Sequence, residues 1–396
     1  MTAPTVPSHP GLKDGPVYLD YNATTPVDPR VVEAMLLYLA TEFGNPGSGH
    51  AYAGRPRTAL AEARAQVATL IGADPDEIVF AGGGSEADTL ALFGTVLARL
   101  AAGSESGPMQ VIIQATEHPA VLEACHALDR RHGVHITVLP VDRDGMVDPA
   151  DLADVIGDRT VLVSVMTANN ETGVIQPIRE LADIAHAHGA LLHTDAPQAA
   201  DKIALDVRDL GVDLLTVAGH KLYAPKGVGA LYVRRGVNLE PVIPGGGQER
   251  GLRAGTENVA AAVALGAAAQ LAAADLAIGG AARMAGLRDE LHHHLARLLP
   301  GRIHLNGHPT RRLPNTLNIS IDGTRGDALL AAASGIAAAT GSACHTGDPT
   351  PSPVLTAMGY SPERALAALR LSLGRWSTSA EIQAAAEHIA KAAGSA

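Results

Sequence analysis

Short apolar runs alternate with helical patterns from Ile78 to about Val233. The apolar runs predict strands at residues 78–80, 111–114, 161–166, 190–193, 214–217 and 229–233. Between them, the spacing of apolar positions predicts helices near residue 86, over 121–131 and from about 178 to 188. Strands that are apolar on both faces are typical of a mostly parallel sheet covered by helices on both sides. We therefore expect an α/β fold with its site beyond the carboxyl ends of the strands.

The pattern changes after about Thr256. A long alanine-rich helical region precedes strands expected at 302–305, 315–321 and 369–373, and helices near residue 327 and from Ser379. Fewer and less regularly alternating elements are typical of a smaller α+β domain. We predict a large domain over residues 17–260 and a small C-terminal domain over 261–396, which includes the N-terminal segment 1–16.

Composition argues against several classes of protein. The chain has 396 residues, 46% of them hydrophobic and 18% charged, which is ample for the cores of two or three domains. Its net charge of −11 argues against a broad nucleic-acid-binding face. The stretch 259–282 is dominated by weakly apolar alanine and interrupted by Gln270 and Asp275, so it predicts a helix of a globular protein and not a membrane span.

The chain has two cysteines, Cys125 and Cys344, and no CxxC pair. This argues against a disulfide framework or a thiolate zinc site and suits a reducing compartment. The first fifteen residues lack the apolar region of a secretory signal, so we expect a cytoplasmic protein. The run 292–294 consists of three histidines, but consecutive helical residues point to different sides, which favours a solvated helix face over a metal site.

Two neighbouring strands end in an acid and a lysine. Asp195 ends one apolar run, and Lys221 follows the next one in Gly219-His220-Lys221. These two groups are the minimum needed to hold pyridoxal 5'-phosphate (PLP): the amine forms an imine with it, and the carboxylate keeps the ring nitrogen protonated. Only five of the 30 basic residues are lysines, and arginine cannot form an imine. Lys221 is therefore the first candidate catalytic residue.

Other strand ends carry groups that suit the same cofactor. The turn Gly82-Gly83-Gly84-Ser85-Glu86 opens a helix and fits either a phosphate or a plain capped turn. The ring of His118 suits stacking and proton transfer, and Asn170 and Gln198 suit a hydrogen bond to the ring hydroxyl oxygen. One such residue alone is more often structural. Five strand ends of this kind in one sheet favour a shared site.

Two residues near the C-terminus are candidates of a different kind. Cys344 is flanked by glycines and prolines, which predicts an irregular, exposed loop and suits either a nucleophile or an ordinary surface thiol. Cys125, inside an apolar helical pattern, fits a structural role. Arg370 stands inside the apolar strand pattern 368–373, and a buried guanidinium needs an anion. That anion is either a substrate carboxylate or an internal acid.

Taken together, these motifs resemble the cysteine desulfurases, which belong to the class V aminotransferase group of fold type I PLP enzymes. The resemblance runs from about residue 17 to 390 and rests on segments 18–26, 43–46, 82–88, 117–118, 169–173, 193–198, 219–221, 245–250, 255–256 and 341–344. The selenocysteine lyases are similar as well, notably at 168–173, 247–250, 312–316 and 343–345. The family's fold implies a mostly parallel, seven-stranded sheet between helices.

The resemblance also implies a role for each site residue. Lys221 would be the Schiff-base lysine and Asp195 the partner of the ring nitrogen. The other implied contacts with the cofactor are the stacking acid/base His118, the hydroxyl contacts Asn170 and Gln198, and the phosphate contacts Gly84, Ser85, His220 and Thr256. Thr256 would reach across from a second subunit of a homodimer. Ala218 departs from the family, which usually has a serine phosphate contact there.

The implied reaction converts L-cysteine to L-alanine. Arg370 and Asn170 would hold the substrate, and Cys344 would keep the sulfur as a persulfide for an acceptor such as an iron–sulfur scaffold or a thiolation enzyme. Alternatives are a selenocysteine lyase acting on L-selenocysteine, another class V aminotransferase or lyase that does not use Cys344, and a catalytically silent subunit. No metal, membrane or direct nucleic-acid partner is expected.

Overall fold

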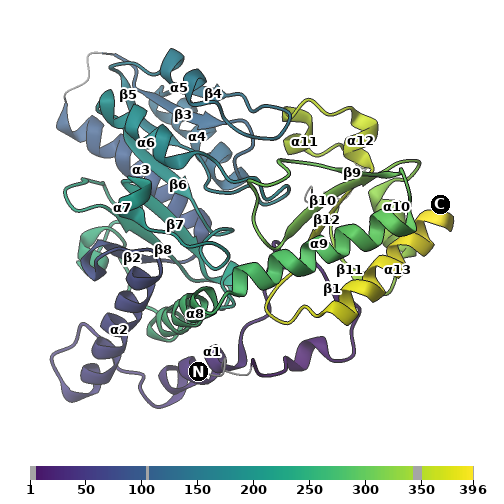
Figure 1. The fold of residues 1–396 in the computed structure, drawn as a ribbon. Coiled ribbons are helices and arrows are strands. Elements are labelled where there is room, and N and C mark those ends of the chain that lie inside the picture. Colours follow the sequence, from purple (N-terminus) through teal and green to yellow (C-terminus); the bar gives the residue numbers. More distant parts are fainter. Residues whose placement is uncertain (1–5, 104–106, 342–349, 396) are drawn as a thin grey trace.

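A computed structural model of the chain describes residues 6–103, 107–341 and 350–395. Its larger sheet has seven strands in the order β2-β8-β7-β6-β5-β3-β4 (Figure 1). The strands are β2 (Ile78–Ala81), β3 (Gln110–Gln114), β4 (His135–Leu139), β5 (Thr160–Ser164), β6 (Leu191–Asp195), β7 (Leu214–Ala218) and β8 (Gly229–Val233). Strand β8 runs opposite to the other six strands of this sheet. The mostly parallel α/β sheet predicted from the sequence is confirmed.

Alternate residues of each strand pack on opposite faces of this sheet. Ile78 and Phe80 belong to one hydrophobic cluster, and Val79 and Ala81 to the other. Burial on both faces explains why most of these strands read as continuous apolar runs. Strand β4 was not predicted from the sequence. This edge strand is partly exposed and alternates polar with apolar residues, so it does not read as a continuous apolar run.

Helices cover both faces of the sheet, as Figure 1 shows. One face packs on α1 (Pro29–Ala40), α2 (Gly54–Leu70), α5 (Pro149–Val155), α6 (Ile178–Ala187), α7 (Val207–Leu210) and α8 (Val259–Ala277). The other face packs on α3 (Gly84–Ala102) and α4 (Pro119–His132). Gly83, with φ 154°, precedes α3, and a side chain at Gly84 would meet Ala218 at 3.3 Å. Glycine thus allows the start of α3 to lie against the end of β7.

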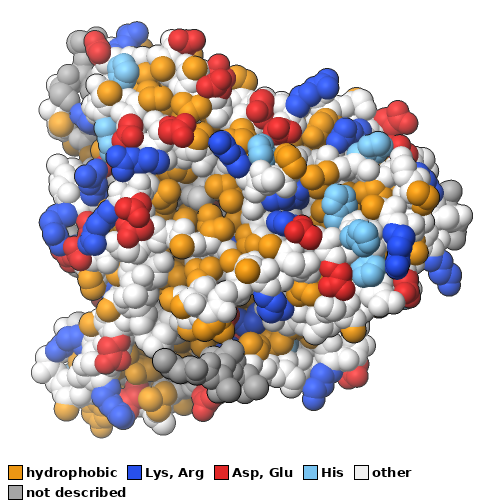
Figure 2. Space-filling model, in the orientation of Figure 1, with side chains coloured by type: hydrophobic (Ala, Val, Ile, Leu, Met, Phe, Trp, Pro, Cys, Tyr) orange, Lys and Arg blue, Asp and Glu red, His pale blue; other side chains and the backbone are white. Residues whose placement is uncertain are grey.

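A second, antiparallel sheet lies in the C-terminal part and has the order β12-β10-β9. Its strands are β9 (Ile303–Leu305), β10 (Thr316–Ile321) and β12 (Ala368–Ser372). It shares a hydrophobic cluster with α9 (Gly280–Leu298), α10 (Gly326–Ala332) and α13 (Ser379–Ser395). The short helices α11 (Pro353–Ala357) and α12 (Pro362–Leu366) complete this part. In Figure 2, apolar side chains gather in the middle of the face and charged ones stand mostly around it.

Each of the two parts includes a chain segment from the other side of the predicted boundary at residue 260. From the N-terminal segment, β1 (Val17–Tyr18) pairs in parallel with β11 (Ile336–Ala337) of the C-terminal part. Helix α8 is long and apolar enough to cross a membrane by length and composition, yet it packs on α1 and α2 in the core of the larger sheet. The domain limits remain a prediction, whereas the packing of α8 explains its apolar composition.

A buried ion-pair cluster ties distant segments together. The Arg375 guanidinium lies 2.7 Å from Asp28 and 2.8 Å from Asp275, and stacks over the Tyr223 ring. Burial alone would raise the pKa of Asp28, but hydrogen bonds from Arg30 and the charge of Arg375 outweigh it and lower this pKa to about 2. The cluster therefore holds the start of α1, the end of α8 and the segment before α13 in place.

We predict that Asp28→Asn destabilises the protein by on the order of 3–5 kcal/mol at neutral pH, because it leaves the buried Arg375 charge with one anion fewer. The folded-state pKa of Asp28 lies below the unfolded value, so its contribution is present above about pH 4 and is lost as pH falls toward 2. Denaturant unfolding at several pH values measures this. Asp76→Asn, at the exposed pair with Arg235, is the control and should change stability little. Equal effects of the two variants would contradict the prediction.

Candidate active site

A cavity of about 380 Å³ opens at the carboxyl ends of the central strands. Eight of the eleven residues predicted for the site line it: Gly84, Ser85, His118, Asn170, Asp195, Gln198, His220 and Lys221. They come from four strand ends and the start of α3. The parallel order of β5, β6 and β7 brings these ends to one edge of the sheet.

Lys221 lies in a short 3-10 turn directly after β7. Its Nζ donates hydrogen bonds to the backbone oxygens of Asn22 and Ala23, at 2.5 and 2.8 Å. Burial, reinforced by the charges of Arg370 and Lys202, lowers the pKa of the amine to about 8. A usable fraction of the amine is thus unprotonated near neutral pH, as imine formation requires.

Asp195 ends β6 and presents an unsatisfied acceptor. Its Oδ1 is buried and has no hydrogen-bond partner among the described residues. Burial raises the pKa of this carboxyl to about 7, against the opposing effect of the Lys221 charge. An unpartnered buried acceptor calls for a donor, and a protonated ring nitrogen is such a donor. This orphan oxygen is the observation that best fits PLP to the cavity.

The start of α3 provides an anion site on another wall of the cavity. Free amide groups of the first turn and the Ser85 hydroxyl lie there. Burial and the nearby Lys221 charge lower the pKa of His220 to about 4, so its ring is neutral. The turn is braced by Glu86, which accepts from the Gly82 amide at 2.9 Å and pairs with Arg253 at 2.8 Å. These features suit the phosphate of the cofactor.

His118 precedes α4 and caps it. Its Nδ1 accepts a hydrogen bond from the Ala120 amide at 3.1 Å, which leaves the proton of the neutral ring on Nε2. Burial and the Lys221 charge lower the pKa of His118, which favours this neutral form. The ring lines the cavity in the form suited to stacking.

Asn22, which the sequence analysis did not single out, connects the predicted residues. Its backbone oxygen accepts from both Lys221 and Gln198, and its Nδ2 donates to the Asn170 carbonyl at 3.2 Å. The Gln198 Oε1 is left buried without a partner among the described residues. Asn22 stands inside the matching segment 18–26, but nothing in its spacing marks it as a site residue. Only the tertiary fold reveals its position.

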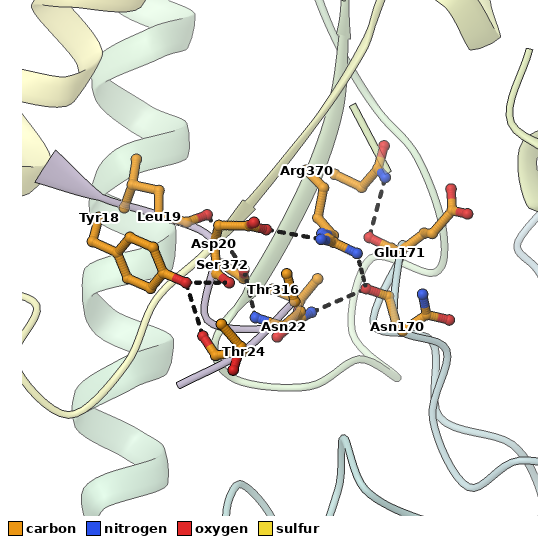
Figure 3. Close-up of polar contacts among 12 residues, drawn as sticks. Tyr18, Leu19, Asp20, Asn22, Thr24, Asn170, Glu171, Thr316, Arg370 and Ser372 are labelled. Carbon is orange, nitrogen blue, oxygen red and sulfur yellow. Dashed lines mark hydrogen bonds and ion pairs between the residues drawn. The ribbon is translucent and has the colours of Figure 1, made fainter. Parts of the chain in front are cut away.

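Arg370, on β12, approaches the same site from the smaller sheet (Figure 3). Its Nη2 pairs with Asp20 at 2.8 Å, and its Nη1 donates to the Asn170 carbonyl at 3.3 Å. The side chain is 6% exposed, and its Nε has no partner among the described residues. An internal anion is therefore present, and the Nε donor of the guanidinium is left for another acceptor.

Besides Arg370, which contacts Asn170 without lining the cavity, two predicted residues remain. Thr256 is exposed, between the turn at 248–251 and α8. Cys344 lies outside the described residues; C-terminal to it, Ser352 donates to Glu171, next to Asn170, at 2.6 Å. Cys125 is buried in α4, and burial raises its pKa to about 12, as suits a structural thiol. Within the described residues, no cluster of three His, Cys, Asp or Glu side chains is placed to hold a metal ion.

Comparison with known proteins gives consistent matches. The model of the class V aminotransferase family matches residues 17–385. The cysteine desulfurase IscS of Methanosarcina thermophila is 44% identical over 368 residues, which are 92% of this chain and 89% of that protein. A solved NifS-like protein has a TM-score of 0.85 at 35% identity and covers 95% of this chain and 98% of its own. A structure described as SspA in complex with cysteine has a TM-score of 0.78 at 33% identity and covers 90% and 98%.

We predict that the Lys221 amine of the apoprotein is acylated with a midpoint near pH 8, because its pKa is about 8 and only the unprotonated amine reacts. Peptide mass spectrometry after brief acetylation over a pH series measures this. In Asp195→Asn the midpoint should fall further, since the Asp195 charge raises the pKa of Lys221. A midpoint near the ordinary lysine value of about 10.4 would refute the prediction.

Proposed function

The chain belongs to the class V aminotransferase family and, within it, to the cysteine desulfurases, and from this we propose that it is the PLP-dependent enzyme that converts L-cysteine to L-alanine and keeps the sulfur on Cys344. The observation that carries this function is the pairing in one cavity of the Lys221 amine, with its pKa lowered to about 8, and the unpartnered Asp195 oxygen. The cysteine desulfurase relatives match nearly the whole chain, which supports the substrate class and the cofactor together.

Different residues of the cavity would bind different parts of the cofactor. Lys221 would bind the aldehyde carbon, Asp195 would face the ring nitrogen, and His118 would lie against the ring. Ser85, His220 and the amides around Gly84 would hold the phosphate, and Asn170 and Gln198 the ring hydroxyl. When bound, PLP withdraws electrons from the α-carbon of the amino acid attached to it. Ala218 offers no hydroxyl to the phosphate, so the remaining contacts hold it.

The protein groups also account for substrate handling. Arg370 would hold the substrate carboxylate through its unpartnered Nε, beside the Asn170 carbonyl. Once displaced from the cofactor, the Lys221 amine would take the α-proton, which its lowered pKa favours. The Cys344 thiolate would then attack the substrate sulfur. A sulfur–sulfur bond forms and the carbon–sulfur bond breaks, with its electron pair going to carbon. That carbon then takes a proton to give alanine.

Sulfur then passes to an acceptor, as in the cysteine desulfurases to which the chain is similar. We infer that the acceptor is a protein such as an iron–sulfur scaffold or a thiolation enzyme, since a persulfide transfers directly to another thiol. Transfer by a free thiolate supports a cytoplasmic, reducing location. Fractionation of cells that express the tagged protein tests this, and recovery outside the cytoplasm would contradict it.

We infer a homodimer. Thr256 is exposed and away from the cavity of its own chain, which suits a contact with the partner subunit's phosphate site. Large apolar side chains are also exposed on and after α1: Leu36 (54%), Leu39 (60%), Phe43 (70%) and Tyr52 (68%). The Phe43 and Tyr52 rings stack on each other, with centroids 5.6 Å apart. An exposed apolar patch of this kind is typical of a subunit interface.

We expect Cys344→Ala to keep the yellow colour of bound PLP and lose alanine formation from cysteine by about two orders of magnitude or more, because the sulfur acceptor is gone. Alanine release and absorption spectra measure this. Cys125→Ala removes the other thiol and should stay active. With selenocysteine, Cys344→Ala should keep much more activity, since selenium leaves more readily. Full activity of Cys344→Ala on cysteine would point instead to another class V lyase.

We expect Thr256→Val to speed PLP loss about tenfold or more, through the loss of a hydrogen bond to the phosphate in the partner's site. Mixed dimers of Thr256→Val and Lys221→Ala subunits distinguish the two arrangements. If Thr256 acts across the interface, one site of each mixed dimer has both residues and retains PLP like the wild type. If mixing restores no site, Thr256 acts within its own chain and the proposed arrangement is wrong.

A further inference from the structure

A row of buried polar side chains crosses three strands beneath the cavity. Ser164 on β5 pairs in register with His193 on β6, and Asp195 pairs with Thr216 on β7. The Ser164 hydroxyl hydrogen-bonds His193 Nδ1 at 2.8 Å, and His193 Nε2 lies 3.1 Å from the Thr216 hydroxyl. Elsewhere this face of the sheet packs apolar residues on α3. Because buried polar groups cost free energy unless they are paired, such a row calls for a function.

Asp88 of α3 faces this row. Its side chain is 2% exposed, lines the same cavity as Asp195, and has its Oδ1 3.7 Å from His193 Nε2. This Oδ1, like the Asp195 Oδ1, has no hydrogen-bond partner among the described residues. Two buried carboxylates thus border one cavity, each with an unsatisfied oxygen. Neither Asp88 nor the row was singled out by the sequence.

The charged groups around Asp88 determine its protonation state. Asp195 faces it from β6 and Glu117 from the segment after β3; burial and these two carboxylates raise the pKa of Asp88 well above its usual range. Burial lowers the pKa of His193 to about 3, so the ring beside Asp88 is neutral. The Lys221 amine lowers the pKa of Asp195 but is not among the groups that shift that of Asp88. Two carboxylates at one buried site cannot both ionise without nearby cations.

We propose that Asp88 is a second acid of the cofactor site, a positioning residue that stays protonated and so leaves the negative charge to Asp195, which would face the ring nitrogen. This rests on the proposed function. An ionised Asp88 would be a second anion at the cavity and would compete with Asp195 for the cofactor's ring proton. A neutral Asp88 offers a hydrogen-bond donor to its neighbours without this effect.

The test uses three variants of the full-length enzyme. Asp88→Asn keeps the shape and neutrality of the protonated acid, and Asp88→Ala removes the donor. Asp213→Asn is the matched control: Asp213 precedes β7, is equally buried, and lies 2.8 Å from His186 Nε2, at the opposite end of the strand. Infrared spectra of apo and PLP-loaded enzyme detect the carbonyl band of a protonated carboxylic acid. A pH titration of the visible band of bound PLP, and the rate of PLP loss, complete the set.

We expect Asp88→Asn to lose a protonated-acid band that Asp213→Asn keeps, and to shift the titration midpoint by no more than about 0.3 pH unit, a twofold change. Asp88→Ala should lose PLP about tenfold faster than the wild type, whereas Asp88→Asn should lose it at close to the wild-type rate. An unchanged protonated-acid band in Asp88→Asn, or a midpoint lowered by about one unit or more, would show that Asp88 is an anion and overturn the proposal. A wild-type protein that does not turn yellow with PLP would refute the proposed function, and the infrared comparison of the apoproteins would still decide the state of Asp88.

Discussion

The site depends on keeping the Lys221 amine buried away from water. Lys221 lies against two backbone oxygens of the N-terminal segment, and burial, with the charges of Arg370 and Lys202, holds its pKa at about 8. A hydrogen-bonded carboxylate partner would stabilise the charged amine and remove its reactivity. The contacts of the amine respect this limit, because both of its hydrogen-bond acceptors are neutral backbone oxygens.

This burial in turn requires three segments that are distant in the sequence to pack around the amine. Asn22 comes from the N-terminal segment, accepts from Lys221 of the large sheet, and is held by Asn315 and Ser372 of the smaller part. Arg370 reaches the same point from β12. The site is therefore formed where both sheets and the N-terminal segment meet, and movement of either sheet would open the amine to water.

Much of this could be predicted from the sequence, because strand ends in a parallel sheet converge whatever the details of packing. Lys221 and Asp195 were found on that ground, together with the strands around them. Edge strand β4 was missed because it is partly exposed and does not read as a continuous apolar run. Asn22, Asp20 and Asp88 were missed because their roles depend on register and on contacts between distant segments. The helix periodicity of α3 gave no sign that Asp88 faces a polar row. Sequence patterns describe local structure well and long-range polar contacts poorly.

The pair between Arg370 and Asp20 bears on how strongly an amino acid would be bound in the proposed arrangement. The guanidinium already has a counter-ion, so a carboxylate that binds its Nε meets a charge that Asp20 has partly neutralised. Alanine carries the same carboxylate as cysteine, and an arginine without an internal partner would grip the product as firmly as the substrate. In the proposed arrangement, Asp20 keeps its pair with Arg370 throughout and would weaken the hold on substrate and product alike, which favours turnover over tight binding.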